Sequence, residues 1–283
     1  MLPNTFRHLP RVGQKTEEAL WAAGLLDWNS ALAAAELPVP RTMDYALRKG
    51  VEESAKRLGE RDARWFAQRL PAGEQWRLFP HFADKAAYID IETTGGLHGQ
   101  DHITTIALYD GREARWWVFG QDLESFLDCV LQYELLVTFN GKCFDIPFIE
   151  RLFGAKIDIA HLDLRYPLKR AGLSGGLKAC EKRLGLDRGD LDGVDGFHAV
   201  LLWEEYVRSG DARFLETLLA YNVEDVINLA ALAAHAYNLL AAQTPLALPR
   251  LESPAPPPNP LTPDRGIIAS LRASIQGMRP RYW

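Results

Sequence analysis

Cysteine is scarce in this chain of 283 residues. The three cysteines, Cys129, Cys143 and Cys180, are odd in number and lack metal-type spacing, so neither a disulfide framework nor a zinc site is expected. No apolar run approaches the roughly 20 residues that cross a bilayer. Residues 1–13 also lack the basic-then-apolar layout of a secretory signal. We therefore expect free thiols and a cytoplasmic protein with no membrane partner.

An excess of positive charge is lacking as well. Lysine and arginine number 32 against 37 acidic residues, which gives a net charge of −5. This balance excludes a protein coated in basic patches, so a polyanionic partner must be met by a local patch or through metal ions. The hydrophobic share of 47% and the charged share of 24% are ordinary for a globular protein. The length suffices for one α/β core and a smaller accessory unit.

The chain divides into four regions by composition and periodicity. They are a mixed helical region (1–84), a region of alternating strands and helices that becomes mainly helical (85–243), a proline-rich linker (244–263) and an amphipathic or disordered tail (264–283).

The second region predicts a mixed sheet flanked by helices, an α/β fold. Apolar alternation predicts strands over 86–92, 102–111, 115–120 and 134–141, with a further edge strand over 161–164. Helical spacing predicts helices over 123–132 and 144–154, the second closed by Gly154.

Two carboxylates stand in the first strand, YIDIETTGG at 88–96. Successive strand side chains alternate between faces, so Asp90 and Glu92 point the same way while Ile89 and Ile91 point into packing. Buried carboxylates repel one another unless a cation lies between them, and Mg²⁺ prefers oxygen ligands. The alternative is a solvated strand edge.

Two further motifs carry carboxylates at element boundaries. In TFNGKCFDIPFI, Asp145 stands at a helix start, where it also fits a helix N-cap, and Asn140 with Gly141 fits a plain turn. In LLAYNVEDVINLAAL, Tyr221 and Asp225 are four apart and share one helix face, which also fits a half-exposed helix. Each motif alone therefore has an ordinary structural explanation.

In order, D-x-E, N-G-x-x-F-D and Y-N-x-x-D resemble the DEDD superfamily of 3′–5′ exonucleases on the ribonuclease H-like fold, and its YprB-like branch most closely. The resemblance covers roughly residues 60–240, including LKACEKRLGLDR. It implies that Asp90, Glu92, Asp145 and Asp225 hold two divalent ions, Mg²⁺ or Mn²⁺. The tyrosine at 221 corresponds to the tyrosine subtype of the superfamily.

The resemblance also implies roles around the metal centre. Tyr221 would orient the attacking water, because an unperturbed phenol with a pKa near 10 is a poor base at neutral pH. Asn140 and the backbone of Thr93 and Thr94 would contact the terminal nucleotide. Asp163, with His161 on the same strand face, would support the site or form a simple edge pair.

A basic segment lies between the second and third motifs. Residues 165–188 hold seven lysines and arginines against two carboxylates. Such a cluster tracks a phosphate backbone, with Lys178 and Arg183 as candidate contacts, or else forms a solvated helix face.

Near the N-terminus, residues 8–28 resemble a helix-hairpin-helix element that binds DNA phosphate. Arg11 stands where that pattern has glycine, whereas Gly13 is kept. The alternative is a helical packing unit with Trp21 and Trp28 in its core.

The sequence therefore predicts a metal-dependent 3′–5′ exonuclease, a hydrolase of DNA or RNA phosphodiester bonds that takes a single-stranded 3′ end. The alternatives are a structure-specific endonuclease on the same centre and a non-catalytic nucleic-acid-binding scaffold. Retention of all four acids and the tyrosine counts against the scaffold. Protein partners are unknown, and the tail either docks one through Ile267, Ile268 and Leu271 or is disordered.

Overall fold

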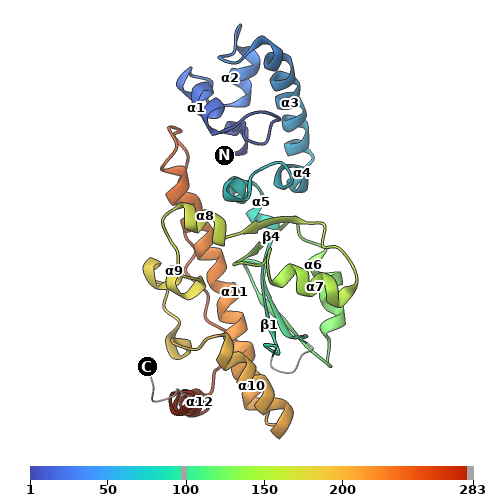
Figure 1. The fold of residues 1–283 in the computed structure, drawn as a ribbon, viewed down its shortest axis with the longest axis vertical. Helices are drawn as coiled ribbons and strands as arrows, with labels where there is room; N and C mark the ends of the chain where they lie inside the picture. The colour runs from blue at the N-terminus through green and yellow to red at the C-terminus, as the bar shows by residue number, and fades with distance from the viewer. Residues whose placement is uncertain (97–100, 279–283) are drawn as a thin grey trace.

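A five-stranded mixed sheet forms the centre of the molecule (Figure 1). The structure, a computed structural model, describes residues 1–96 and 101–278. The strands are β1 (Ala86–Thr93), β2 (Ile103–Tyr109), β3 (Ala114–Val118), β4 (Leu135–Thr138) and β5 (Ala160–Asp163). Their order is β3-β2-β1-β4-β5, with β1 antiparallel to β2 and parallel to β4. The predicted mixed sheet and its edge strand are thus confirmed.

Helices cover both faces of this sheet (Figure 1). On one face lie α6 (Phe126–Val130) and α7 (Asp145–Phe153), and on the other α8 (Arg165–Arg170), α9 (Leu177–Leu184), α10 (Gly196–Ser209) and α11 (Ala212–Ala241). The helix predicted over 123–132 is shorter, because a 3₁₀ turn, η4 (Leu123–Ser125), precedes α6. Helix α7 ends as predicted at Gly154, which is left-handed with φ 60°.

The strand alternation divides the core in two. Ile89 and Ile91 pack with Phe126 and Ile149 on the side of α6 and α7. Tyr88 belongs to the other face, in a cluster that includes Val226 and other side chains of α11. Because side chains alternate along β1, Asp90 and Glu92 project toward α11, as the sequence predicts.

The N-terminal helices pack at one end of the sheet (Figure 1). They are η1 (Leu2–Asn4), α1 (Gln14–Ala22), α2 (Trp28–Ala33), α3 (Arg41–Gly59), α4 (Ala63–Ala67), η2 (Ala72–Leu78), α5 (Phe79–Phe82) and η3 (Ala83–Lys85). Trp21 and Trp28 are buried in the same hydrophobic cluster as Tyr88. Arg11, at the glycine position of the hairpin pattern, has a φ of 66°, which explains why that pattern favours glycine there.

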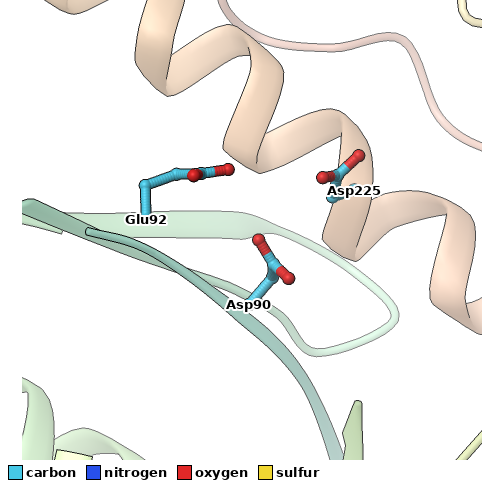
Figure 2. A group of neighbouring side chains, drawn as sticks. All are labelled: Asp90, Glu92 and Asp225. Atoms are coloured by element: carbon cyan, nitrogen blue, oxygen red, sulfur yellow. The ribbon is translucent and has the colours of Figure 1, made fainter. Parts of the chain in front are cut away.

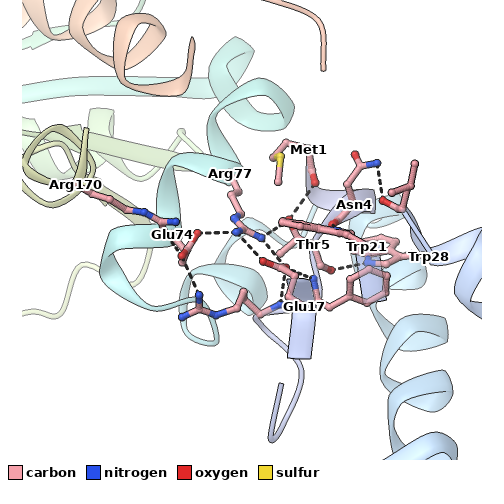
Figure 3. Close-up of polar contacts among 12 residues, drawn as sticks. Met1, Asn4, Thr5, Glu17, Trp21, Trp28, Glu74, Arg77 and Arg170 are labelled. Carbon is pink, nitrogen blue, oxygen red and sulfur yellow. Dashed lines mark hydrogen bonds and ion pairs between the residues drawn. The ribbon is translucent and has the colours of Figure 1, made fainter. Parts of the chain in front are cut away.

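A buried group of charges joins these helices to the rest of the chain (Figure 3). Arg77 in η2 donates to both Glu17 oxygens at 2.7 and 2.8 Å and lies 2.8 Å from Glu74. All three side chains are at most 3% exposed. Glu74 also pairs with Arg7 and with Arg170 of α8. One network thus links α1, η2 and α8.

The proline-rich segment forms neither helix nor strand, as predicted, and follows α11 in reverse. Asn238 bonds both backbone groups of Leu251, and Asn259 donates to the Ala220 carbonyl. These contacts hold the segment against the helix that carries Asp225.

The C-terminal segment forms α12 (Arg265–Met278). Ile267 and Ile268 are 8% and 3% exposed in a cluster with Trp203 of α10, and Leu271 packs beside them. The prediction that these side chains dock a partner or are disordered is therefore wrong, because they cover their own chain. Residues 279–283 of the predicted tail lie outside the described residues.

The structure bears on two expectations from composition, which concern the cysteines and membrane-spanning helices. Cys129, Cys143 and Cys180 are free thiols. Within residues 1–96 and 101–278, no helix combines the length and the apolar character needed to cross a bilayer.

Candidate active site

The predicted carboxylates of β1 meet a carboxylate from α11 (Figure 2). Asp90, Glu92 and Asp225 each offer one oxygen, and these oxygens lie within 4.8 Å of one another. The sequence separates the two elements by more than a hundred residues, and the packing of α11 across β1 brings them together. Such an oxygen-only donor set fits a hard divalent cation.

Asp145, at the start of α7, lines the same pocket but lies outside the group of three carboxylates whose oxygens are within 4.8 Å of one another. Its side chain accepts the Ile91 N–H of β1 at 3.1 Å, and the N-cap position of α7 is held by Phe144. Asp145 is 3% exposed. All four predicted acids line one pocket of about 310 Å³. The ordinary explanation of Asp145 as a helix N-cap is therefore wrong.

Burial and mutual repulsion raise the pKa values of Asp90, Glu92 and Asp145. The pKa of Asp90 is raised by burial and then by Asp145, Asp225 and Glu92. Burial also raises the pKa of Asp145 to about 7. The pocket therefore holds its negative charge at a free-energy penalty that a cation would relieve. Asp225 Oδ1 is buried and is paired with the guanidinium of Arg188.

Asn222 places α11 on the sheet. Its Nδ2 donates to Asp90 Oδ2 at 2.8 Å, and its Oδ1 accepts from Thr105 Oγ1 of β2 at 3.0 Å. The side chain is fully buried, so both bonds form away from water. Sequence reasoning missed this residue, although it directly follows Tyr221 in the third motif.

Tyr221 lies one helical turn before Asp225 and is 3% exposed. The alternative prediction of a half-exposed helix face is therefore wrong. Lys178 of α9 donates to Tyr221 Oη, and its Nζ lies 4.4 Å from the ring centre. Burial, followed by the charges of Asp225 and Glu92, raises the pKa of Tyr221 far above its ordinary value. The phenol therefore keeps its proton at neutral pH, while its oxygen accepts the hydrogen bond from Lys178.

Arg188 reaches the site from behind. Its Nη2 lies 2.5 Å from Asp225 Oδ1, while its Nη1 donates to Glu181 at 2.9 and 3.0 Å. Asn228 of α11 donates to the same Glu181 at 3.0 Å. Arg188 is 4% exposed, so it is not part of a phosphate-tracking surface. Arg170 pairs with Glu74 but is exposed, so the predicted basic cluster is wrong at Arg188 alone.

Asp163 organises the turn that follows β4. Its carboxylate accepts the backbone N–H of Asn140 at 2.7 Å, of Lys142 at 3.1 Å and of Arg165 at 3.1 Å. His161 instead shares a hydrogen bond of 2.8 Å with Thr138 Oγ1. Asp163 therefore supports the turn, and the predicted alternative of an edge pair with His161 is wrong.

A second pocket of about 590 Å³ adjoins the acidic one. The two pockets share Phe139, Asn140, Gly175 and Gly176 as lining residues. The second is also lined by Arg165 and Lys169, both exposed cations. Two members of the basic segment thus flank the acidic pocket.

The remaining predicted contacts lie outside the linings of both pockets. Thr93 is buried at the end of β1, and the Thr94 N–H donates to the His102 carbonyl at 3.1 Å. Arg183 is exposed and donates to the Gly172 carbonyl at 3.4 Å.

An acidic pocket on a mixed sheet, flanked by helices, defines an α/β protein with a nuclease-type centre. The chain belongs to the RNase_H superfamily, whose family model matches residues 87–237. This membership indicates a nuclease with a nucleic-acid substrate, and the acidic group provides a site for a divalent cation.

Among solved structures, the chain is similar to the family B DNA polymerase from the hyperthermophilic archaeon Pyrobaculum calidifontis. The two are 16% identical with a TM-score of 0.40, over 54% of this chain. The match spans 25% of the polymerase chain. No curated protein matches the sequence.

Proposed function

We propose that this protein is a metal-dependent 3′–5′ exonuclease that hydrolyses phosphodiester bonds of DNA or RNA with two divalent ions, Mg²⁺ or Mn²⁺. The observation that carries the proposal is the common pocket: four carboxylates, Tyr221 and Lys178 all line it. The nuclease unit would be residues 85–243, with 1–84 as an accessory helical region, 244–263 as a linker and 264–283 as its C-terminal extension.

Asp90, Glu92 and Asp225 would hold a divalent ion, with Asp145 completing the ligand set. Bound divalent ions in such centres activate a water and offset the charge on the attacking and leaving oxygens. The carboxylates come from rigid elements, β1, α7 and α11, which fixes their positions before substrate arrives.

Tyr221 would position the attacking water and not deprotonate it, since its raised pKa keeps the phenol neutral. The Lys178 ammonium has only donors, so Tyr221 Oη must accept from it. The tyrosine proton is then left to point at another acceptor in the pocket. The charge of Lys178 lies where a phosphate oxygen of the substrate would enter.

The second pocket would carry the strand that continues beyond the cleaved bond. Arg165 and Lys169 supply positive charge there, and Asn140 stands at the boundary between the two pockets. Thr93, Thr94 and Arg183 stay as proposed contacts at the margins. Cation contacts to phosphate do not distinguish the sugar, so DNA and RNA are separated by experiment.

The test is cleavage of 5′-labelled single-stranded DNA and RNA with Mg²⁺ or Mn²⁺, using the wild type, Asp90→Asn and Asp158→Asn. Asp158 is half-exposed and pairs with Arg64 on the surface, so its variant is a matched control. A 3′-shortening ladder with wild type and the control, lost in Asp90→Asn and in EDTA, is expected.

Other outcomes redirect the proposal. Discrete internal cuts on duplex or flap substrates would replace the exonuclease with a structure-specific endonuclease. Binding of these substrates without cleavage, equal in wild type and Asp90→Asn, would leave a nucleic-acid-binding scaffold.

A further inference from the structure

A permanent cation outside the lining of the acidic pocket pairs with one of the pocket's carboxylates. Arg188 Nη2 lies 2.5 Å from Asp225 Oδ1. A guanidinium keeps its charge at all physiological pH values. A divalent ion bound by Asp225 therefore meets a fixed positive charge at that carboxylate.

A second carboxylate divides the charge of Arg188. Both oxygens of Glu181 accept from Nη1, and Asn228 fixes Glu181 at 3.0 Å. Glu181 and Arg188 are 1% and 4% exposed, so water screens the network little. Glu181 and Arg188 thus anchor one another, and only Nη2 is left to Asp225.

We propose that Arg188 is the positioning residue of the metal centre and that its sharing between Glu181 and Asp225 sets how tightly the acidic pocket holds a divalent cation. The inference rests on the proposed function. When no ion is bound, Arg188 keeps Asp225 in place. When an ion binds, Glu181 retains Arg188 and reduces its competition for Asp225.

The proposal predicts opposite effects from two substitutions. Glu181→Gln removes the negative charge that draws Arg188 away from Asp225. Arg188 then competes more strongly for Asp225, so Mn²⁺ binding weakens. Glu181→Gln/Arg188→Met also removes the competitor. Mn²⁺ then binds more tightly than in the wild type, and at least about tenfold more tightly than in Glu181→Gln, because Coulomb energies at contact distance are large in a poorly screened site. The double variant leaves Asp225 without its ion-pair partner, so some loss of folding stability is expected in it.

The measurement is Mn²⁺ binding to the full chain without substrate, by titration calorimetry and by electron paramagnetic resonance of free Mn²⁺. Glu205→Gln and Glu205→Gln/Arg208→Met are matched controls, since they break an exposed pair on α10. Melting curves establish that each variant is folded.

If both test variants weaken Mn²⁺ binding, or both leave it unchanged, the role of Arg188 is overturned while metal binding stands. If the wild type binds no Mn²⁺, the proposed nuclease and the role of Arg188 both fall. If the variants shift in opposite directions but no nucleic acid is cleaved, only the proposed function fails.

Discussion

Asp145 is a site residue whose pKa lies near neutral pH. Burial raises its pKa to about 7, and the charges of Asp163 and Asp225 contribute. In an unfolded chain an aspartate titrates near about 3.9. Between these values the folded protein retains a proton that the unfolded chain has released. Folding stability from this group therefore falls as pH rises through the window from about 4 to about 7.

Asp145→Asn imitates the protonated acid and removes this loss. Without metal, we expect the variant to match the wild type near pH 4 and to exceed it in stability at pH 8. The comparison between chains is necessary because buried His8, His81 and His161 have lowered pKa values and give the opposite slope in both proteins. Urea unfolding in EDTA measures the difference, and a difference independent of pH would contradict the assignment. At pH 8, added Mg²⁺ is expected to reduce the difference in unfolding free energy between Asp145→Asn and the wild type.

At the scale of elements, one carboxylate holds a junction together. Asp163 at the end of β5 accepts backbone N–H groups from the turn after β4 and from the start of α8. That turn contains Asn140, whose φ of 68° is left-handed. Asp163 is fully buried, so water cannot replace these bonds. The shape of the boundary between the two pockets therefore depends on a side chain that lines neither.

Asp163→Asn leaves one acceptor oxygen and turns an NH₂ group toward backbone donors. We expect a loss of about 1–3 kcal/mol of folding free energy, the cost of unsatisfied buried polar groups. Cleavage should fall as well, through a raised KM. Asp158→Asn, on an exposed pair, is expected to change stability by less than about 0.5 kcal/mol. Equal melting curves for the two variants would show that the backbone contacts of Asp163 carry no stability.

Local patterns predict the elements of this fold better than the partners of single side chains. Alternation in YIDIETTGG places Asp90 and Glu92 on one face because a strand has a period of two, whatever lies opposite. The burial of Arg188 depends on Glu181, Asn228 and Asp225, which only tertiary packing brings together. A run of charged residues predicts a solvent-exposed surface, because most charged side chains are solvated. The fold of the nuclease unit was therefore predictable, but the second layer of its site was not.

At the scale of the whole molecule, the N-terminal helices and the sheet form one cooperative body. Apolar side chains of the N-terminal helices and of one face of the sheet belong to a single cluster, which runs from Met1 to Ala241. The buried pair of Arg77 and Glu17 lies within it, and Arg77 also lies 5.7 Å from the ring centre of Trp21. Removing one member of a buried pair leaves an unpaired charge in the interior.

Arg77→Met is expected to cost about 3–5 kcal/mol for this reason. Because the core is shared, the whole chain should melt in a single transition at a lower temperature. Circular dichroism and tryptophan fluorescence would then give the same midpoint, although four of the eight tryptophans lie within residues 1–84 and four lie beyond them. Lys49→Met, in a pair that is 59% and 55% exposed, should leave that midpoint nearly unchanged. Two separate melting transitions would contradict the expectation that the N-terminal helices and the sheet unfold together.

The turn at Asn140 and Gly141 has a consequence for the chemical lifetime of the protein. A side chain at Gly141 would collide with Thr138, so glycine is required there. Asparagine followed by glycine is the pair that cyclises and deamidates most readily in flexible chains. The nitrogen that would attack is the Gly141 N–H, and it donates to Thr138 Oγ1 at 3.2 Å. Deamidation of Asn140 is therefore coupled to loosening of the turn. In a stored sample, the Asn140 amide would be lost first in those molecules whose pocket has already opened.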